Sequence, residues 1–341
     1  MPTAGVDISA SGIKIATFSE HLAGLELAQF AEERLAAGVI QKGEISDRPA
    51  IDAALEHLAH KYHIRFAHIT LPEARGYLFE AEVPGSTPEE WRTAVEQRLA
   101  EYVPLPPRDV VFDVVPLHEK GNSAHVVGVG YARRVAESSI TAFEDAGITV
   151  RSVEGEMFAL TRALLPQGDQ ETVLIIDIGK TTTKLLVATN RLPRFATTLD
   201  VGGHALTLAV QKHFGVTEEE AKRVKAEQGL VVSQENEEYR AAVLSTVSVI
   251  RDEIVRRLDY WQGRSGSVSA HEPVTRAILV GGNATLRGLP EYLEASLKVP
   301  VSLGDVFRNL ARPDDWLPPI DYTESLAYGT AIGLALRSYQ A

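Results

Sequence analysis

Two short segments of the chain each place an aspartate at the end of an apolar run, directly before a turn of small and hydroxyl-bearing residues. They are Asp7-Ile-Ser-Ala-Ser-Gly12 and Asp177-Ile-Gly-Lys-Thr-Thr-Thr183. Such turns present backbone N–H groups and hydroxyls to phosphate oxygens. An aspartate beside them suits a hydrated Mg²⁺ that is held mainly by phosphates. The pair therefore predicts a phosphate site with Asp7 and Asp177 close to the metal.

A third segment, Gly281-Gly282-Asn283, follows the apolar run 277–280. A glycine pair lets a ligand ring approach the backbone closely, which favours nucleotide binding. Two other phosphate motifs are excluded. The segment Gly179-Lys180-Thr181 is not the end of a P-loop, because that motif needs glycine where Leu174 stands. No G-x-G-x-x-G follows a predicted strand, so the dinucleotide fingerprint is absent.

The elements around the two turns occur in the same order twice. Strands are predicted at 4–8, 13–18, 25–33 and 68–72, with a helix after Pro49. Strands at 172–178, 183–189, 194–200 and 277–282, with a helix from Gly203 to about Phe214, repeat this order. Aligning Asp7 with Asp177 also aligns Lys14 with Lys184. The repeat predicts an α/β fold of two similar lobes built on mixed sheets.

Residues 76–149 break the repeat. They read as a strand near 77–83, a helix from Pro88 to about Tyr102, strands at 110–117 and 124–132, and a helix at 136–146. This β-α-β-β-α pattern predicts a small insert in the first lobe. We therefore expect a first lobe of 1–75 with 150–171 and 323–341, the insert at 76–149, and a second lobe of 172–322 whose part at about 203–262 is helical.

Composition narrows the classes of function. The 341 residues carry 34 Lys plus Arg and 46 Asp plus Glu, a net charge of −12, and no Cys. An acidic chain does not favour general nucleic-acid binding, and disulfides and thiolate metal sites are excluded. No apolar run has the length of a membrane span, and the start has no signal-peptide pattern. We expect a cytoplasmic protein that reaches a membrane only through a partner.

Together these segments resemble the actin/chaperone/sugar-kinase ATPase superfamily, and within it the PilM family of type IV pilus assembly. The turns are specific only to the superfamily. Other stretches are similar to the narrower family, namely YVPLPPRDVVFDVVPL at 102–117, AFEDAGITVRSVEGEMFALTRAL at 142–164, DVGGHALTLAVQKHFGVTEEEAKRVK at 200–225, ILVGGNATLRGLPEYLEASLKVPV at 278–301 and AYGTAIGLALR at 327–337. The resemblance implies an actin-like two-lobe fold with an insert like subdomain 1C of FtsA.

The resemblance also implies roles for individual residues toward ATP and Mg²⁺. Asp177 would be oriented toward the magnesium shell, and Glu154 falls where relatives place a group that can act on the attacking water. The residues implied to contact the nucleotide are Asp7, Ser9, Ser11, Gly12, Lys14, Gly179, Lys180, Thr181, Thr182, Gly202, Gly203, Lys225, Gly281, Gly282 and Asn283.

Three positions depart from the family pattern. Ser9 stands where glycine is usual, Lys180 stands where a small residue is usual, and Lys222 stands where glutamate is usual. Lys180 could pair with a phosphate or fill the pocket, and Lys222 removes an acceptor for ribose hydroxyls. We therefore expect at most slow ATP hydrolysis, with bound nucleotide serving mainly to close the lobes.

The implied partner is the N-terminal cytoplasmic tail of a PilN-like membrane protein, held between the first lobe and the insert, together with other proteins of the inner-membrane platform. Two alternatives stay open. A small-molecule kinase would need a general base after Gly202-Gly203, where His204 stands instead of Asp. An FtsA-like filament protein would usually end in an amphipathic membrane helix, whereas this sequence ends in SYQA.

Overall fold

The apolar runs of the repeat form two five-stranded sheets with the same strand order, β10-β6-β1-β2-β3 and β15-β14-β11-β12-β13. The computed structural model describes residues 2–21, 24–231, 236–263, 272–310 and 316–340. By its contacts the chain divides into a first unit, Met1–Gln170 with Thr189–Ala196 and Asp305–Ala341, and a second unit, Glu171–Ala188 with Thr197–Gly304. The repeated order confirms the prediction of two similar sheets.

In the first sheet, β1, β6 and β10 run parallel, while β2 is antiparallel to both β1 and β3. The elements of this part are β1 (Ala4–Ser9), β2 (Gly12–His21), β3 (Gly24–Arg34), β4 (Ile40–Gln41), β5 (Glu44–Ile45), α1 (Arg48–Tyr62), β6 (Phe66–Leu71), η1 (Glu73–Arg75), α4 (Arg133–Asp145), β10 (Thr149–Gly155), α5 (Glu156–Leu164), α10 (Tyr322–Ser325), η4 (Leu326–Tyr328) and α11 (Gly329–Leu336).

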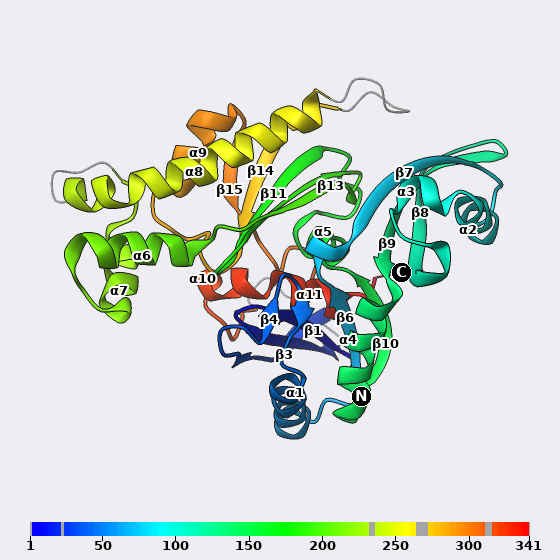
Figure 1. Cartoon of the computed structure of the whole chain (residues 1–341), viewed down its shortest axis with the longest axis horizontal. Coiled ribbons are helices and arrows are strands. Elements are labelled where there is room, and N and C mark those ends of the chain that lie inside the picture. The colour runs from blue at the N-terminus through cyan, green and yellow to red at the C-terminus, as the bar shows by residue number, and fades with distance from the viewer. Residues whose placement is uncertain (1, 22–23, 232–235, 264–271, 311–315, 341) are drawn as a thin grey trace. The chain divides into compact units, whose positions relative to one another are not determined.

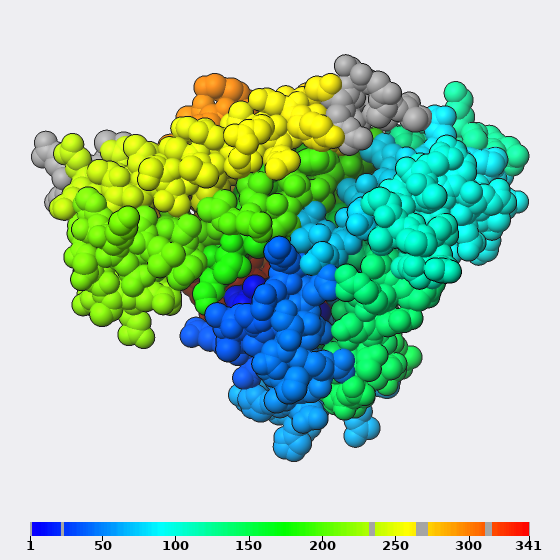
Figure 2. Space-filling model, in the orientation of Figure 1, coloured from blue at the N-terminus to red at the C-terminus, as the bar shows by residue number. Residues whose placement is uncertain are grey.

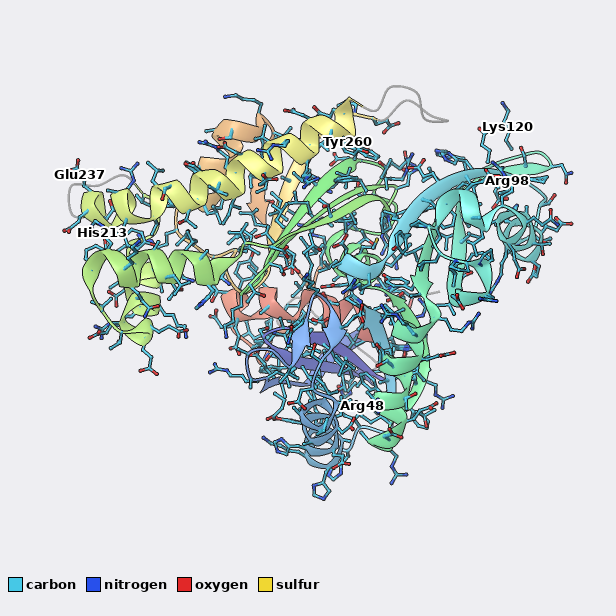
Figure 3. The ribbon with its side chains drawn as sticks, in the orientation of Figure 1. Arg48, Arg98, Lys120, His213, Glu237 and Tyr260 are labelled. Carbon is cyan, nitrogen blue, oxygen red and sulfur yellow. The ribbon has the colours of Figure 1, made fainter. Side chains whose placement is uncertain are left out.

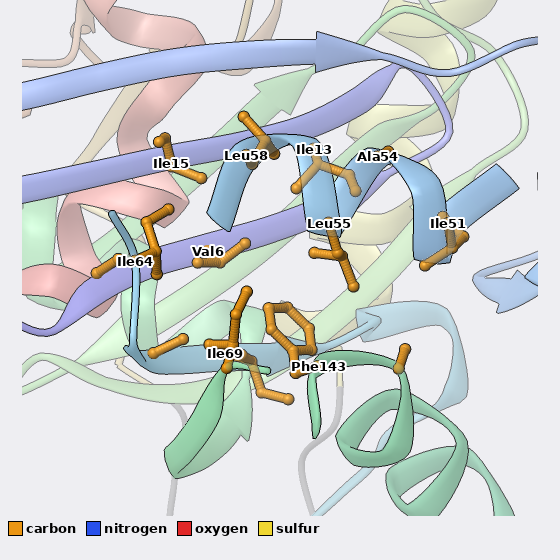
Figure 4. Packing of buried hydrophobic residues seen from close by; sticks show 14 of the residues in the cluster. Val6, Ile13, Ile15, Ile51, Ala54, Leu55, Leu58, Ile64, Ile69 and Phe143 are labelled. Carbon is orange, nitrogen blue, oxygen red and sulfur yellow. The ribbon is translucent and has the colours of Figure 1, made fainter. Parts of the chain in front are cut away.

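Helix α1 covers one face of this sheet. Asp47 caps its N-terminus by accepting a hydrogen bond from the Ala50 N–H (3.2 Å), and Pro49 occupies its first turn. Its apolar residues recur at helical spacing and pack on β1 and β2, where Val6, Ile13 and Ile15 are almost fully buried (Figure 4). Each such side chain contributes about 1.5–3 kcal/mol by leaving water.

Helix α11 is buried along its whole length between β1 and α5. Two glycines permit this close packing. A Cβ on Gly5 would lie 2.0 Å from the carbonyl oxygen of Ala331, and one on Gly333 would lie 1.9 Å from that of Ala159. No side chain fits at either position, so the chain's closing helix is an integral part of the first unit's core.

The insert is a three-stranded antiparallel sheet of order β7-β9-β8, with helices on one face (Figure 1). Its elements are β7 (Tyr77–Pro84), α2 (Pro88–Gln97), α3 (Leu99–Tyr102), η2 (Pro107–Asp109), β8 (Val110–Lys120) and β9 (Ser123–Ala132). The single helix predicted from Pro88 to Tyr102 is two helices, because the backbone at Arg98 (φ −119°, ψ 15°) leaves the helical region. Nothing in the sequence around Arg98 marks that break.

The second sheet and the helices that follow it complete the chain. They are β11 (Thr172–Ile178), β12 (Thr183–Thr189), β13 (Leu192–Leu199), α6 (Gly203–Phe214), α7 (Glu218–Gln228), α8 (Glu237–Gln262), β14 (Arg276–Val280), α9 (Leu289–Leu297) and β15 (Val301–Leu303). Strands β11, β14 and β15 are parallel. Helices α6 and α7 lie side by side, with α8 along them, and their atoms are closely packed in Figure 2.

Helix α8 shows how the sequence sets this packing. Val243, Val247, Ile250 and Ile254 recur every three or four positions and are buried, whereas Val249 and Tyr260 on other faces are more than half exposed. In Figure 3, His213 at the end of α6 and Glu237 at the start of α8 lie at the same end of the helical segment. The expected helical part of the sequence is thus a three-helix layer.

Candidate functional site

In both units, predicted site residues lie at or directly after the carboxyl ends of parallel strands. In the first unit β1 ends at Ser9, two residues after Asp7. In the second, β11 ends at Ile178 directly after Asp177, and Gly281 follows the neighbouring parallel strand β14. Ligands of open α/β sheets bind at this edge. Each unit therefore carries one set of candidate residues.

The first turn, between β1 and β2, is held by its own hydroxyl groups. The Ser9 and Ser11 hydroxyl oxygens lie 3.0 Å apart, and the Ser9 hydroxyl donates to the carbonyl oxygen of Gly12 (3.1 Å). The Leu35 N–H donates to the carbonyl oxygen of Ser11 (3.3 Å). A Cβ on Gly12 would lie 2.5 Å from the Glu33 carbonyl oxygen, so glycine is needed beside β3.

The charged pair of this hairpin is buried and compensated. Asp7 and Lys14 are directly opposed across β1 and β2, and each is 8% exposed. The Thr70 hydroxyl donates to Asp7 Oδ1 (3.3 Å). Lys14 Nζ lies 3.0 Å from Glu32 Oε1 and 3.5 Å from the Ser11 hydroxyl. Lys14 therefore contacts the turn and β3 and lies opposite Asp7.

The second turn, residues 179–182, is anchored through its carbonyl groups. The Gly179 carbonyl accepts hydrogen bonds from the Gly203 N–H (3.0 Å) and the Asn283 amide (3.0 Å). The Lys180 carbonyl accepts from the His204 N–H (2.8 Å). No cis peptide occurs in the described residues. In a trans peptide, the N–H of the next residue points opposite to the carbonyl. The N–H groups of Lys180 and Thr181 therefore point away from α6, as an anion cradle requires.

Three glycines allow this arrangement. A Cβ on Gly202 would lie 2.8 Å from the carbonyl oxygens of Gly179 and Lys180, and one on Gly203 would lie 1.9 Å from Asn283 Oδ1. Gly281 has φ +95°, and its Cβ would lie 2.3 Å from Asp177 Oδ1. The loop after β14 thus packs directly on the turn and on the aspartate, while the neighbouring Gly282 is exposed.

Lys225 on α7 joins these segments. Its Nζ donates to the Gly203 carbonyl (3.2 Å), to the Thr207 hydroxyl (3.3 Å) and to Asn283 Oδ1 (2.8 Å). Burial, and secondarily the charge of Lys222, lowers the pKa of Lys225 from 10.5 to about 8. The structure therefore brings Lys225 together with Gly203, Thr207 and Asn283 at the start of α6, as a partly buried cation.

Asp177 is itself paired with a lysine. Lys184 Nζ, on β12, lies 3.7 Å from Asp177 Oδ2, and both side chains are mostly buried. A magnesium ion prefers oxygen ligands with uncompensated negative charge. Among the residues that the structure describes, no group of three or more acidic or histidine side chains is placed to hold a metal. A hydrated Mg²⁺ held mainly by phosphates would therefore meet an aspartate that is already paired with Lys184.

Glu154 lies at the end of β10 within an ion cluster of the first unit. Arg162 donates to both of its carboxylate oxygens (2.5 and 2.7 Å), and Arg337 donates to Oε2 (2.6 Å). Its side chain is only 8% exposed. These contacts fix the end of β10 to α5 and to the segment after α11. A role of Glu154 toward water stays a prediction.

Sequence reasoning missed a second carboxylate at the same strand end. Glu156 is the first residue of α5, directly after β10, and is 5% exposed. It therefore lies at the ligand-binding edge defined by the parallel strands β1, β6 and β10. The signal in the sequence is an acidic residue that opens the apolar helix MFALTRAL, where a helix N-terminus favours negative charge.

No helix in the described part of the chain is long and apolar enough to cross a membrane.

Comparison with known structures identifies the fold. The chain is similar to a PilM-PilN type IV pilus biogenesis complex, with 21% identity, a TM-score of 0.81, and coverage of 100% of this chain and 99% of the other. It is also similar to MreB5 of Spiroplasma citri bound to ADP (13% identity, TM-score 0.59, coverage 100% and 99%). A third similar structure is the ethanolamine utilization protein EutJ of Carboxydothermus hydrogenoformans (16%, 0.56, 98% and 89%).

At these identities the structures establish the actin-like ATPase fold, which confirms the predicted fold class. The family is shown by a separate finding. The family model described as type IV pilus assembly protein PilM matches residues 5–339, which is nearly the whole sequence. The chain therefore belongs to the PilM family of actin-like type IV pilus assembly proteins.

Proposed function

We propose that this protein is a nucleotide-binding scaffold of type IV pilus assembly that binds the N-terminal cytoplasmic tail of a PilN-like membrane protein. The observation that carries the proposal is the family match over residues 5–339. The similar solved structure, a PilM-PilN complex, supports the choice of partner. The protein would then sit at the cytoplasmic face of the inner membrane, anchored by the partner's tail and by other platform proteins.

The insert sheet offers a surface for an extended tail. Strand β8 is an edge strand, paired on one side only with β9. One face of the sheet packs on α2 and α3. On the other face, Val111 and Val129 are partly exposed beside the buried Leu71 and Tyr131. An edge strand with apolar side chains on one face supports capture by added main-chain hydrogen bonds and side-chain pockets.

We assign the nucleotide to the residues around the second turn. The outward N–H groups of Lys180 and Thr181 suit phosphate oxygens, and Lys225 supplies a partly buried positive charge at the start of α6. Gly282 is exposed and has no side chain, which supports close approach of a flat ring to the backbone there. The similarity to MreB5 bound to ADP is consistent with this assignment. The nucleotide that we propose for these residues is ATP.

The proposed role of the nucleotide is to bind rather than to be turned over rapidly. Glu154 already has two arginine partners, and the carboxylate of Asp177 is paired with Lys184. To orient an attacking water, these carboxylate oxygens would have to share or give up their contacts with arginine and lysine. Any hydrolysis would therefore be slow.

The tail assignment is tested by fluorescence anisotropy with a labelled synthetic peptide. The peptide carries the N-terminal cytoplasmic residues of a PilN-like protein from the same organism. We expect Val115→Asp, a half-buried position of β8, to weaken binding by at least about tenfold, because a carboxylate loses about 1.4 kcal/mol or more on entering an apolar contact.

The matched control is Val249→Asp on α8, which is 56% exposed and belongs to the second unit. Its affinity for the peptide should equal that of the unchanged protein. Failure of the unchanged protein to bind the peptide would contradict the proposed partner. Equal weakening of peptide binding by both variants would show that the tail does not bind at β8.

A further inference from the structure

Two buried carboxylates lie at the carboxyl edge of the first sheet, close to the insert. Strands β6 and β10 are parallel neighbours, and Leu71 of β6 is paired with Gly155 of β10 (Figure 1). Glu73 begins η1 two residues after Leu71, and Glu156 begins α5 directly after Gly155. The two glutamates are only 8% and 5% exposed. The chain thus places two acidic side chains at adjacent strand ends, where η1 leads into the insert.

The Tyr131 hydroxyl, from strand β9 of the insert, lies at the same place. A Cβ added to Gly76 would lie 2.8 Å from the hydroxyl oxygen, and one added to Gly155 would lie 3.0 Å from it. Gly76 follows η1 and Gly155 precedes α5, so the hydroxyl is next to both acidic segments. Burial raises the pKa of Tyr131, and the charges of Glu73 and Glu156 raise it further, which agrees with this placement.

The chemistry of this place calls for a hydrogen-bond donor from another molecule. Tyr131 is 3% exposed, yet within the described part of the chain its hydroxyl has no hydrogen-bond partner. An unpartnered buried hydroxyl is costly, so native proteins rarely keep one unless another molecule completes the bond. A tyrosine hydroxyl can accept a hydrogen bond, and carboxylates only accept. A positively charged donor suits the three groups together.

This place is continuous with the face of the insert sheet that we propose for the tail. Tyr131 is opposite Val111 of β8, and Val129 precedes it by two positions on β9, so the three side chains share one face. Both valines pack against the cluster of Leu71 and Tyr131. A tail with apolar side chains over the valines would therefore bring its neighbouring residues toward Tyr131.

Arginines on the neighbouring elements have other partners. Arg75 of η1 lies 3.0 Å from Glu44 Oε1, and Arg133, which begins α4, donates to two backbone carbonyls of the insert (3.1 Å each). Glu154 is held by the two arginines described above. The N-terminal end of α5, a region of positive potential, is matched by the carboxylate of Glu156. A cation beside Tyr131 would not have to displace these arginine contacts.

We propose that Glu73, Glu156 and Tyr131 bind a positively charged group of the partner's tail, either its N-terminal amine or a lysine or arginine side chain. This inference rests on the proposed capture of the tail and adds the chemistry that recognises it. The carboxylates compensate the charge, and the Tyr131 hydroxyl accepts a hydrogen bond from the cation. Cytoplasmic segments next to a membrane span are rich in Lys and Arg, so such a tail carries the required groups.

Fluorescence anisotropy at pH 7, with the full chain and a tail peptide labelled at its C-terminal end, tests the inference. Each Lys and Arg of the peptide is replaced in turn by methionine, and a separate peptide is N-acetylated. We expect one of these changes to weaken binding by at least about tenfold, about 1.4 kcal/mol, and thereby to identify the source of the charge. If the unchanged peptide binds and no change weakens binding by more than about twofold, the inference is wrong.

A double-mutant cycle connects the lost affinity to the carboxylates. Glu156→Gln should weaken binding of the unchanged peptide by about tenfold, whereas the peptide without the charge should bind both proteins within about threefold of each other. The matched control is Asp113→Asn, an exposed carboxylate opposite Val129 on the same face, which should change the affinity by less than about twofold. Equal losses for both variants, or a loss that persists with the uncharged peptide, would overturn the assignment.

Tyr131→Phe removes only the hydroxyl and separates binding from stability. Because the hydroxyl has no partner in the described chain, the variant should have a Tm equal to or above that of the unchanged protein. Its affinity for the peptide should fall by about threefold to fivefold. A lower Tm with unchanged affinity would show that the hydroxyl is structural and would overturn the contact.

The two proposals fail differently in these measurements. If the unchanged peptide does not bind the unchanged protein, the proposed partner itself is wrong. If the peptide binds regardless of its charges, the partner stands and the site at Tyr131 is wrong.

Discussion

The two hairpins of the repeat occupy equivalent places in sheets of the same strand order, yet their turns are held in opposite ways. In the first turn, the hydroxyls of Ser9 and Ser11 bond within the hairpin. In the second, the carbonyls of Gly179 and Lys180 bond to α6, which directs the following N–H groups outward. The first turn is thus closed by its own side chains, and the second presents its backbone.

The difference shows that a repeated strand pattern determines where a turn lies but not which of its backbone or side-chain groups face a ligand. The element packed beside the turn determines which groups face outward. Beside the first turn, β3 brings Glu32 to Lys14. Beside the second, α6 brings amide donors to the turn's carbonyls, and the loop after β14 brings Asn283. If the second hairpin binds a ligand and the first only stabilises the fold, substitutions in the two hairpins should affect ligand affinity and unfolding free energy differently.

The largest effect is expected from Gly281→Ala. Its added Cβ would lie 2.3 Å from Asp177 Oδ1, and alanine is strained at φ +95°. We expect a loss of about 3 kcal/mol of unfolding free energy, combining a steric clash with a backbone penalty. ATP affinity should fall by more than tenfold, because the loop moves away from the turn. Urea unfolding and calorimetry measure the two quantities.

Gly121→Ala is the control for the backbone penalty alone. Gly121 has φ +61° and no atom within 4 Å of its added Cβ. It lies in the β8–β9 turn, next to Lys120 at the tip of the insert (Figure 3). Gly121→Ala should lower the unfolding free energy by about 1 kcal/mol and leave ATP affinity unchanged. Equal costs for both variants would show that the contact with Asp177 is not tight.

The next effect is a pH dependence carried by Lys225. Its pKa is lowered from 10.5 to about 8, so between these values the unfolded chain binds more protons than the folded one. Stability therefore rises with pH through this window, and the full cost of the buried charge is present below pH 8. Relative to Lys225→Met, the unchanged protein should gain about 2 kcal/mol between pH 7.5 and 10.

Urea unfolding of both proteins at several pH values gives the difference directly, because the titration of all other groups cancels. A difference that stays flat with pH would show that Lys225 is solvated in solution. Lys225→Met should also abolish tight ATP binding, since its cation lies at the start of α6.

A smaller effect compares the two lysines of the hairpins. Lys14 is 3.0 Å from Glu32 and its side chain is 10% exposed, whereas Lys184 is 3.7 Å from Asp177 and 22% exposed. We expect Lys14→Gln to lower the unfolding free energy by about 1.5 kcal/mol and Lys184→Gln to lower it by about half as much. Thermal and urea unfolding compare the variants.

The same two variants also test how Mg²⁺ affects ATP binding. Lys184→Gln removes the cation beside Asp177, so Mg²⁺ should now improve ATP binding more than it does in the unchanged protein. Lys14→Gln should not produce this change if its role is structural. An identical response to Mg²⁺ in both variants would contradict the contrast between the hairpins.

Much of the fold could be predicted from the sequence because its signals are local. Apolar strands ending in aspartate recur with the same spacing, and Ile51, Leu55 and Leu58 mark a helix face. The break at Arg98 could not be predicted, because no glycine or proline marks it.

The candidate site was less predictable because its contacts are long-range. Glu154 is held by Arg337, which is 183 positions away, and Lys225 is bonded to Asn283, 58 positions away. Residue type and spacing identify both as candidates but cannot show that one is already engaged by two arginines. The outward direction of the second turn's N–H groups likewise depends on α6, not on the turn's own sequence.

The smallest effects come from single hydroxyls, and they test the contrast most directly. Ser11→Ala removes contacts to Ser9 and Lys14, so it should lower the unfolding free energy by about 0.5–1 kcal/mol. Thr181→Ala removes an exposed hydroxyl from the second turn, so stability should stay within about 0.5 kcal/mol of the unchanged protein while ATP binds about threefold more weakly. Since the two positions occupy corresponding turns, the opposite pattern of results would assign the ligand to the first hairpin and the structural role to the second.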